Sequence, residues 1–303
     1  MTVRIRSRQL CLALILALPI SSQAQSVALT FDDGFNPREQ PQAASWNAAI
    51  LAALSNAGIK SILFAAGKRV DSPEGLALVK LWGGAGHAVG NHTYSHLNFG
   101  SGQTSLEVFI ADVERDEALL KDMPGWIRRF RFPYLKEGDT AAKRDKFRTW
   151  LAAHEYNTGA VSIDASDWYY NSRYLSWKQA HPNDDPSSFR TAYLDHLWSR
   201  AAYYDALSQR LFHRSVKHVL LLHANAINAA FLPDVIAMFR SKGWAFDSPD
   251  EAYQDPVYAM KQTVLPAGES ILWSLSRQNG FNDLRNPAED DIYEKPLLDA
   301  LNL

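Results

Sequence analysis

Cysteine is almost absent from this sequence of 303 residues, and the single cysteine, Cys11, lies in an N-terminal apolar segment. If that segment is removed, no thiol remains, which excludes disulfides and thiolate metal sites. Any bound metal must then use nitrogen and oxygen ligands. An excess of one charge is also missing, since 31 Lys and Arg stand against 33 Asp and Glu. The composition therefore gives no indication of nucleic-acid binding.

Long hydrophobic runs are missing as well. The apolar run from Leu10 to Ile20 has roughly ten residues, too few to span a bilayer. It follows three arginines and precedes Ser22-Gln23-Ala24, small residues at the spacing that a signal peptidase recognises. We therefore expect residues 1–24 to be a signal peptide, with an uncleaved N-terminal anchor as the alternative. The mature protein would be secreted or periplasmic, without a transmembrane anchor.

Strand-like apolar runs alternate with stretches of helical periodicity, with no internal repeat and no low-complexity linker. Strands are predicted at about 27–31, 59–65, 86–90, 129–132, 160–163, 216–222 and 244–246. Helices are predicted at about 45–57, 72–84, 104–123, 140–154, 186–212 and 232–242, and residues 248–251 are predicted to cap a final short helix. Residues 165–186 are polar and aromatic without a period, which predicts a loop. The pattern favours one α/β domain with about seven mostly parallel strands, which can close into a barrel. We place this catalytic domain at residues 25–262 and a C-terminal extension, packed on it or partly loose, at 263–303.

The first predicted strand ends in two adjacent carboxylates, Asp32 and Asp33, followed by Gly34. Two carboxylates at the end of a strand repel each other, and a divalent metal or an arginine usually offsets that repulsion. A solvated Asp-Gly turn is the alternative. The pair itself does not indicate which carboxylate would bind a metal.

Titratable groups also follow the other predicted strands, where sites collect in barrels and parallel sheets. His92 and His96 are four residues apart, and on a helical turn their rings would share one face. Two imidazoles and one carboxylate form a three-ligand site with an open position, typical of a hydrolytic metal centre. A pair of structural histidines is the alternative for an isolated motif. Trp168, beside two acidic residues, could line a sugar-sized pocket.

Five segments resemble, in order, the motifs of the polysaccharide deacetylases, the NodB-homology domain of carbohydrate esterase family 4. They are Thr30-Phe31-Asp32-Asp33-Gly34, His92-Thr93-Tyr94-Ser95-His96, Arg131-Phe132-Pro133-Tyr134, Asp164-Ala165-Ser166-Asp167-Trp168 and Leu220-Leu221-Leu222-His223. The resemblance covers about residues 26–260. It implies a distorted (β/α) barrel with a single catalytic domain. It also implies one divalent metal held by Asp33, His92 and His96, with Zn²⁺ expected and Co²⁺, Ni²⁺ or Mn²⁺ as alternatives.

The same resemblance assigns the remaining roles. Asp32 would be the general base and His223 the general acid. Arg131 would hold Asp32, and Asp167 would orient and tune His223. The backbone N–H of Tyr134 would stabilise the oxyanion together with the metal.

The sequence departs from the family pattern at several positions. Phe35 follows Asp-Asp-Gly where proline is frequent, Leu135-Lys136-Glu137 follow Tyr134, and Ala88 stands where an acid is common. The loops after Gly34 and Trp168 are long. Because such loops line the cleft in the family, they leave the choice of glycan open.

We expect a metal-dependent deacetylase acting on an N- or O-acetylated polysaccharide or oligosaccharide, with Tyr134 and Trp168 contacting the sugar. The protein would be a monomer that binds no nucleic acid. One alternative is a C–N hydrolase of a small cyclic amide or imide on the same fold, against which the signal peptide argues. Another is a non-catalytic carbohydrate-binding protein. That would require a lost ligand, base or acid, and the sequence retains all of them.

Overall fold

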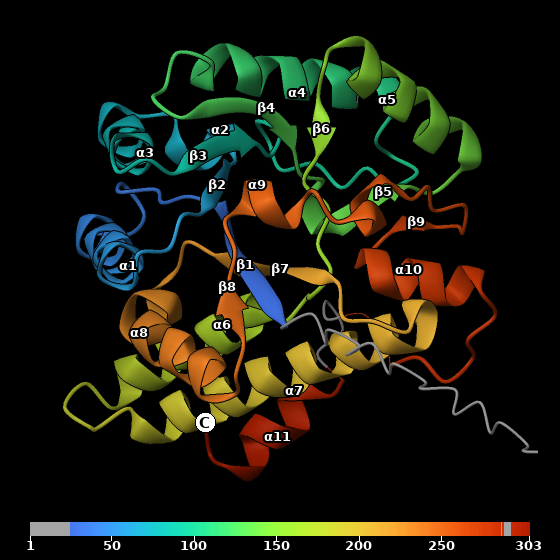
Figure 1. The fold of residues 1–303 in the computed structure, drawn as a ribbon. Coiled ribbons are helices and arrows are strands. Elements are labelled where there is room, and N and C mark those ends of the chain that lie inside the picture. Colours follow the sequence, from blue (N-terminus) through green and yellow to red (C-terminus); the bar gives the residue numbers. More distant parts are fainter. Residues whose placement is uncertain (1–24, 286, 288–291) are drawn as a thin grey trace, which may run out of the picture.

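The computed structural model describes residues 25–285, 287 and 292–303. The predicted signal peptide, with Cys11, lies outside these residues. Within them, a curled sheet of seven parallel strands has the order β6-β4-β3-β2-β1-β7, and β8 pairs with β1 (Figure 1). The strands are β1 (Ser26–Asp33), β2 (Ile62–Ala65), β3 (Ala88–Asn91), β4 (Trp126–Phe130), β6 (Asn157–Thr158), β7 (Lys217–His223) and β8 (Ala245–Phe246). The predicted distorted (β/α) barrel is confirmed.

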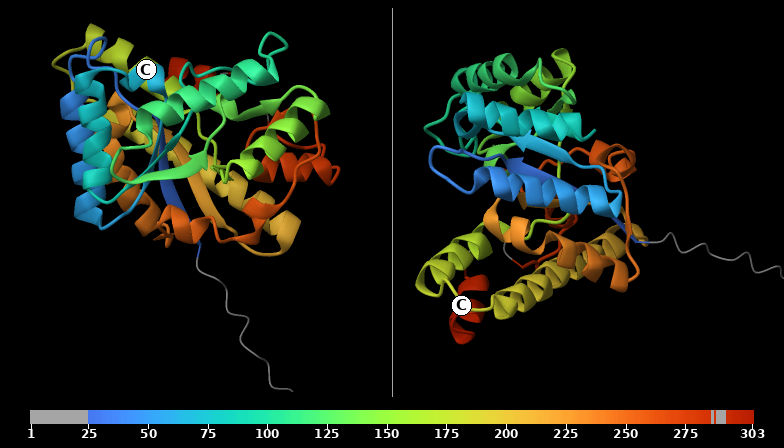
Figure 2. Two further views of the ribbon diagram at one scale, coloured as in Figure 1. Left: turned by 90° about the horizontal axis from the view of Figure 1, so that it is seen from above. Right: turned by 90° about the vertical axis from the view of Figure 1, so that its left-hand side faces the viewer.

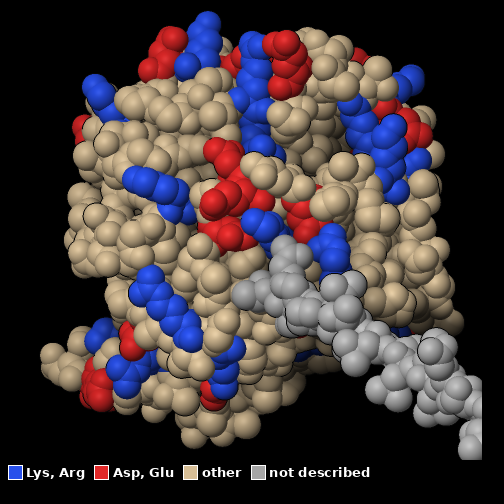
Figure 3. Space-filling model, viewed as in Figure 1, with Lys and Arg blue, Asp and Glu red and all other residues tan. Residues whose placement is uncertain are grey.

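Helices surround the outside of this sheet (Figures 1 and 2). They are α1 (Ala43–Ala57), α2 (Gly67–Val70), α3 (Pro73–Gly84), α4 (Leu106–Leu120), α5 (Ala141–Ala153), α6 (Asp167–Ala180), α7 (Ser187–Phe212), α8 (Ala226–Ser241) and α9 (Pro249–Ala252). Among the described residues, no helix has the length and apolar character needed to cross a membrane. On the face shown in Figure 3, basic side chains are scattered among acidic ones.

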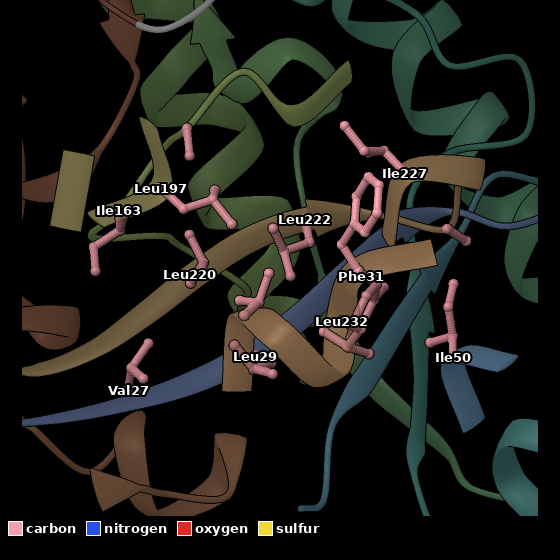
Figure 4. Close-up of a cluster of buried hydrophobic side chains, with 14 of the residues drawn as sticks. Val27, Leu29, Phe31, Ile50, Ile163, Leu197, Leu220, Leu222, Ile227 and Leu232 are labelled. Atoms are coloured by element: carbon pink, nitrogen blue, oxygen red, sulfur yellow. The ribbon is translucent and has the colours of Figure 1, made fainter. Parts of the chain in front are cut away.

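The central strands are buried on both faces, which explains their continuous apolar sequence. Val27, Leu29 and Phe31 of β1 are fully buried. They lie with Leu220 and Leu222 of β7 against the surrounding helices (Figure 4). The parallel register pairs Asp32 with His223 across β1 and β7. The apolar core therefore fixes two candidate catalytic groups at the same edge of the sheet.

Several predicted boundaries are wrong, and the most consequential error concerns residues 165–186. Most of this stretch is helix α6, not a loop. Its buried face consists of Asp167, Tyr170 and Tyr174 rather than aliphatic residues. An apolar period was therefore not visible in the sequence.

Other elements differ in their limits. Residues 160–163 do not form a full strand and contribute an isolated bridge between Ile163 and Leu220. Helix α8 begins at Ala226, six residues before the predicted start, because the Asn225 side chain accepts a hydrogen bond from the N–H of Asn228. Helix α4 is capped by Ser105 and not by a box starting at Thr104.

The described part of residues 263–303 contacts the rest of the domain. Strand β9 (Ala267–Gly268) pairs with β5 (Lys136–Gly138) in an antiparallel ladder. Helix α10 (Ile271–Gln278) packs on α7, and Leu298 of α11 (Glu294–Ala300) is fully buried. This segment is therefore part of the packed structure.

Candidate active site

Asp32 is a buried carboxylate held by an arginine. It is 2% exposed, and Arg131 Nη1 donates to Asp32 Oδ1 at 2.9 Å and to Thr30 Oγ1 at 3.0 Å. Arg131 Nε donates to the Gly159 carbonyl at 2.7 Å, which fixes the guanidinium in place. Burial raises the pKa of Asp32 to about 6, although Arg131 acts in the opposite direction. A carboxylate with this pKa can accept a proton near neutral pH.

Asp33, His92 and His96 form a possible metal site, because one ligand atom from each lies within 4.8 Å of the others. Asp33 Oδ1 is buried and has no hydrogen-bond donor among the described residues, and His96 Nε2 lies 3.5 Å away. His92 Nδ1 lies 2.9 Å from the Arg131 carbonyl. Donation from Nδ1–H to that oxygen leaves Nε2 free to bind a cation.

The protonation states of these three side chains also fit a cation. Burial lowers the pKa of His92 and His96, which keeps both imidazoles neutral. Burial opposes ionisation of Asp33, but Arg69 and the nearby histidines outweigh it and hold the Asp33 pKa below its usual range. Neutral imidazoles and an ionised carboxylate are the forms that bind metals.

The two histidines do not lie on a helical turn, contrary to the prediction. The segment after β3 is an irregular loop in which Thr93 and His96 have left-handed backbone, with φ of 59° and 56°. Asp33 is also left-handed, with φ of 78°. The ring centroids of His92 and His96 are still 4.9 Å apart. A strained loop therefore brings the rings together.

Two carboxylates of α4 hold this loop, and sequence reasoning missed both. Asp116, fully buried, accepts the His92 N–H at 3.2 Å, and Asp112 accepts the Ser95 N–H at 2.8 Å. Burial raises the Asp116 pKa well above its usual value. The available signal was a pair of aspartates spaced i, i+4 on the inward face of an amphipathic helix, where aliphatic residues are expected.

Arg69, on α2, was also missed. Its Nη2 lies 3.2 Å from Asp33 Oδ2, the oxygen not shared with His96. A hollow of about 320 Å³ beside it is lined in part by Arg69, His96 and Tyr134. Tyr134 is 48% exposed with φ of 56°, and its ring centroid lies 4.6 Å from that of His96. The predicted oxyanion residue therefore lies beside the candidate metal ligands.

His223 and Asp167 form the opposite side of the site. His223 Nδ1 lies 2.6 Å from Asp167 Oδ1. Asp167 Oδ2 accepts the His223 N–H at 2.7 Å and the side-chain amides of Asn225 and Asn228 at 3.0 and 2.7 Å. Burial disfavours the imidazolium, but Asp167 outweighs it and the pKa of His223 is raised to about 9. At neutral pH an imidazole with this pKa is protonated and can donate a proton. Trp168, the next residue after Asp167, is 40% exposed.

Comparisons with known proteins agree with this geometry. Residues 20–150 match the polysaccharide deacetylase family model. The peptidoglycan-N-acetylglucosamine deacetylase of Bacillus cereus is 29% identical over 143 residues, which are 47% of this chain and 46% of that protein. These matches support a NodB-like polysaccharide deacetylase domain of carbohydrate esterase family 4. It spans about half the length of this curated relative.

Solved family 4 structures extend the comparison to the fold of most of the chain. The family 4 domain of a multidomain xylanase from the hindgut metagenome of Trinervitermes trinervoides gives a TM-score of 0.52 at 17% identity, covering 80% of this chain and 95% of that one. A Streptococcus mutans family 4 esterase gives 0.52 at 18% identity, covering 75% and 87%. These structures share the fold over 75–80% of this chain, whereas the family-model match ends at residue 150 and does not include His223.

Proposed function

We propose that this protein is a metal-dependent deacetylase that hydrolyses acetyl groups on an N- or O-acetylated glycan. The observation that carries the proposal is the β1–β7 register. It sets Asp32, the candidate proton acceptor, opposite His223, the candidate proton donor, beside the cluster of Asp33, His92 and His96. Base, acid and candidate metal ligands therefore converge at one sheet edge.

Asp33, His92 and His96 would hold the ion, and two nitrogens with one oxygen suit Zn²⁺ well. When bound, a divalent ion supplies Lewis-acid activation of water and of the acetyl carbonyl. Its charge would also lower the pKa of Asp32 and favour the ionised base.

Asp32 accepts a proton from the attacking water as the bond to the acetyl carbon forms, and Arg131 keeps the carboxylate oriented. The Tyr134 backbone N–H stabilises the negative charge that develops on the carbonyl oxygen. His223 then donates its proton to the leaving nitrogen or oxygen as the acyl bond breaks, and acetate is released. Each proton transfer of this type contributes about 10²–10⁴-fold in rate.

The domain limits and the location belong to the same proposal. Residues 1–24 would be the signal peptide, 25–262 the catalytic domain and 263–303 an extension. A secreted or periplasmic monomer would have access to extracellular glycans. The B. cereus relative is named for peptidoglycan N-acetylglucosamine, which makes that polymer the first to test.

The test is acetate release from peptidoglycan, chitin, xylan and an acetylated exopolysaccharide, with and without a chelator. We expect release from at least one polymer, its loss on chelation and its recovery with Zn²⁺ or Co²⁺. His92→Ala should lose both metal and activity, whereas His154→Ala, an exposed histidine outside the site, should lose neither. Full activity of protein shown to be metal-free by elemental analysis would contradict the proposal.

A further inference from the structure

A groove of about 490 Å³ lies away from the catalytic residues, between helices α1, α6 and α8. Trp46 and Ala49 of α1, Leu175 and Lys178 of α6, and Ala230 of α8 line it. Trp46 is partly buried, and the centroid of its ring lies 6.1 Å from that of the Phe35 ring. Leu175 is 39% exposed, so the groove presents a large aliphatic side chain to solvent.

Helix α6 connects this groove to the catalytic acid. Its first residue is Asp167, the partner of His223, and Trp168 follows. Trp168 and Leu175 are seven residues apart, so they lie on one face of the helix about 10 Å apart along its axis. Between them, Asn171 accepts the Ile227 N–H at 3.1 Å, which joins α6 to the start of α8. In the right-hand view of Figure 2, α6 and the loop between β1 and α1 lie at the same end of the molecule.

The groove combines two kinds of surface. The Trp46 ring, Leu175 and the alanines are apolar, whereas Gln42, Ser45 and Lys178 supply hydrogen-bonding groups. A sugar ring presents an apolar C–H face and a rim of hydroxyls, and it matches this mixture. Lys178 is the one basic residue among those that line the groove. The groove therefore has too little positive charge to favour a polyphosphate backbone.

We propose that this groove binds a distal sugar of the glycan whose acetyl group is hydrolysed, with the chain lying along the Trp168–Leu175 face of α6. The inference rests on the proposed function and adds that the substrate is a polymer bound at more than one site. Short substrates reach only the catalytic centre, whereas longer ones also occupy the groove. Affinity should therefore rise with chain length.

The test blocks the groove by placing a large side chain on one of its exposed alanines. Ala49→Trp fills the groove from α1, and Ala48→Trp is the matched control, because Ala48 is also exposed on the same helix but does not line the groove. Ala230→Trp and its control Ala237→Trp repeat the comparison on α8. The probes are the di- and hexasaccharides of β-1,4-linked N-acetylglucosamine and an aryl acetate.

We expect Ala49→Trp and Ala230→Trp to raise the KM for the hexasaccharide about tenfold or more, as for the loss of a filled subsite. Turnover of the disaccharide and the aryl acetate should stay within about twofold of wild type, a change too small to reflect a lost contact. Both control variants should behave as wild type on all three probes. Equal hexasaccharide KM values in blocked and control variants, or equal losses on all three probes, would overturn the groove assignment.

Binding of the hexasaccharide, measured by calorimetry on the same variants, separates this inference from the proposed function. Wild-type protein that releases no acetate from any probe, nor from any of the four polymers above, contradicts the proposed function. Hexasaccharide binding that Ala49→Trp abolishes and Ala48→Trp retains would support the groove in either case. No binding by wild type, or binding that neither blocking variant weakens, would overturn it.

Discussion

The two sides of the candidate active site are built differently. The metal side combines the last residue of β1, Asp33, with the irregular loop after β3, and both Asp33 and His96 have left-handed backbone. The acid side joins the ends of two regular elements, His223 at the end of β7 and Asp167 at the start of α6, with left-handed backbone only at the helix N-cap, Ser166. Left-handed backbone at non-glycine residues costs about 1–3 kcal/mol per residue and persists only where neighbours enforce it. We therefore expect changes on the metal side to weaken cation binding, and changes on the acid side to weaken proton transfer.

The largest effect should come from the adjacent aspartates, which meet on the metal side but have different surroundings. Asp33→Asn removes the charge that faces the two histidines, and should lose bound metal and nearly all turnover. Asp32→Asn should keep the metal and lose about 10²–10⁴-fold in turnover, because it removes a proton acceptor only. The measurements are the bound metal, by elemental analysis, and kcat, both on the same preparations of the two variants. Equal metal loss in both variants would show that the two roles are not divided in this way.

His223→Ala tests the acid side. Metal should stay bound, and turnover of an N-acetyl substrate should fall by about 10²-fold or more because the leaving amine needs a proton. Loss on an aryl acetate should be much smaller, since a phenolate leaves without protonation. The informative quantity is the ratio of amide to aryl-ester turnover. If the variant and wild type share that ratio, His223 is not the proton donor.

The metal side could be recognised from sequence, but its shape could not. Asp32-Asp33-Gly34 and the His92–His96 spacing follow predicted strands, which was enough to place the ligands together. The helical turn expected for the histidines was wrong because the loop conformation depends on Asp112 and Asp116. These residues come from a helix that begins ten residues after His96, and local sequence cannot show such contacts.

On the acid side, strand β7 was predicted almost to the residue because its apolar run is continuous. Helix α6 was missed because the polar network around Asp167 occupies its buried face. Asn225 and Asn228 could not be connected with the site from the sequence, because their side chains reach the distant Asp167 carboxylate only in the folded structure. The barrel was therefore predictable from apolar patterning. The Arg131–Asp32 and Asp167–His223 contacts were expected from the family resemblance. The supporting contacts of Asp112, Asp116, Asn225 and Asn228 were not.

The acid side should also show its electrostatics in a pH profile. Asp167 is the main charge that raises the His223 pKa to about 9, so in Asp167→Asn burial is opposed only by the more weakly acting Asp33 and Asp32 and the pKa falls. The basic limb of activity should move toward acid. Once the His223 pKa lies below 8, the rate at pH 8 should drop about tenfold for every further pH unit by which that pKa falls. If the basic limb does not move, Asp167 does not set the pKa of His223.

The same pair predicts how stability depends on pH. Because the folded-state pKa of His223 is raised above its unfolded value of about 6.5, its contribution to stability is complete below pH 6.5. That contribution is lost as pH rises through about 9. Thermal unfolding of wild type should therefore show a stability decline in this window that is reduced in Asp167→Asn. If both proteins lose stability identically as pH rises, other titrating groups and not the His223–Asp167 pair cause the decline.

The smallest effect on turnover should come from Asp116, which supports the metal side without facing the substrate. Asp116→Ala leaves the buried His92 N–H without an acceptor, so the loop should hold the imidazole less well. Metal affinity should fall by about 10–100-fold, as for other groups that orient a ligand, while kcat at saturating metal changes only a few-fold.

Asp116→Asn distinguishes orientation from charge. Burial raises the pKa of the Asp116 carboxyl well above its usual value and so favours its neutral form. An amide, which retains the acceptor oxygen, should therefore restore most of the affinity. Glu114→Ala, exposed on the same helix, is the control for general effects on α4, and metal competition titration is the measurement. If Asp116→Asn binds metal as poorly as Asp116→Ala, the carboxyl acts through negative charge, and the metal side depends on electrostatics rather than on loop geometry.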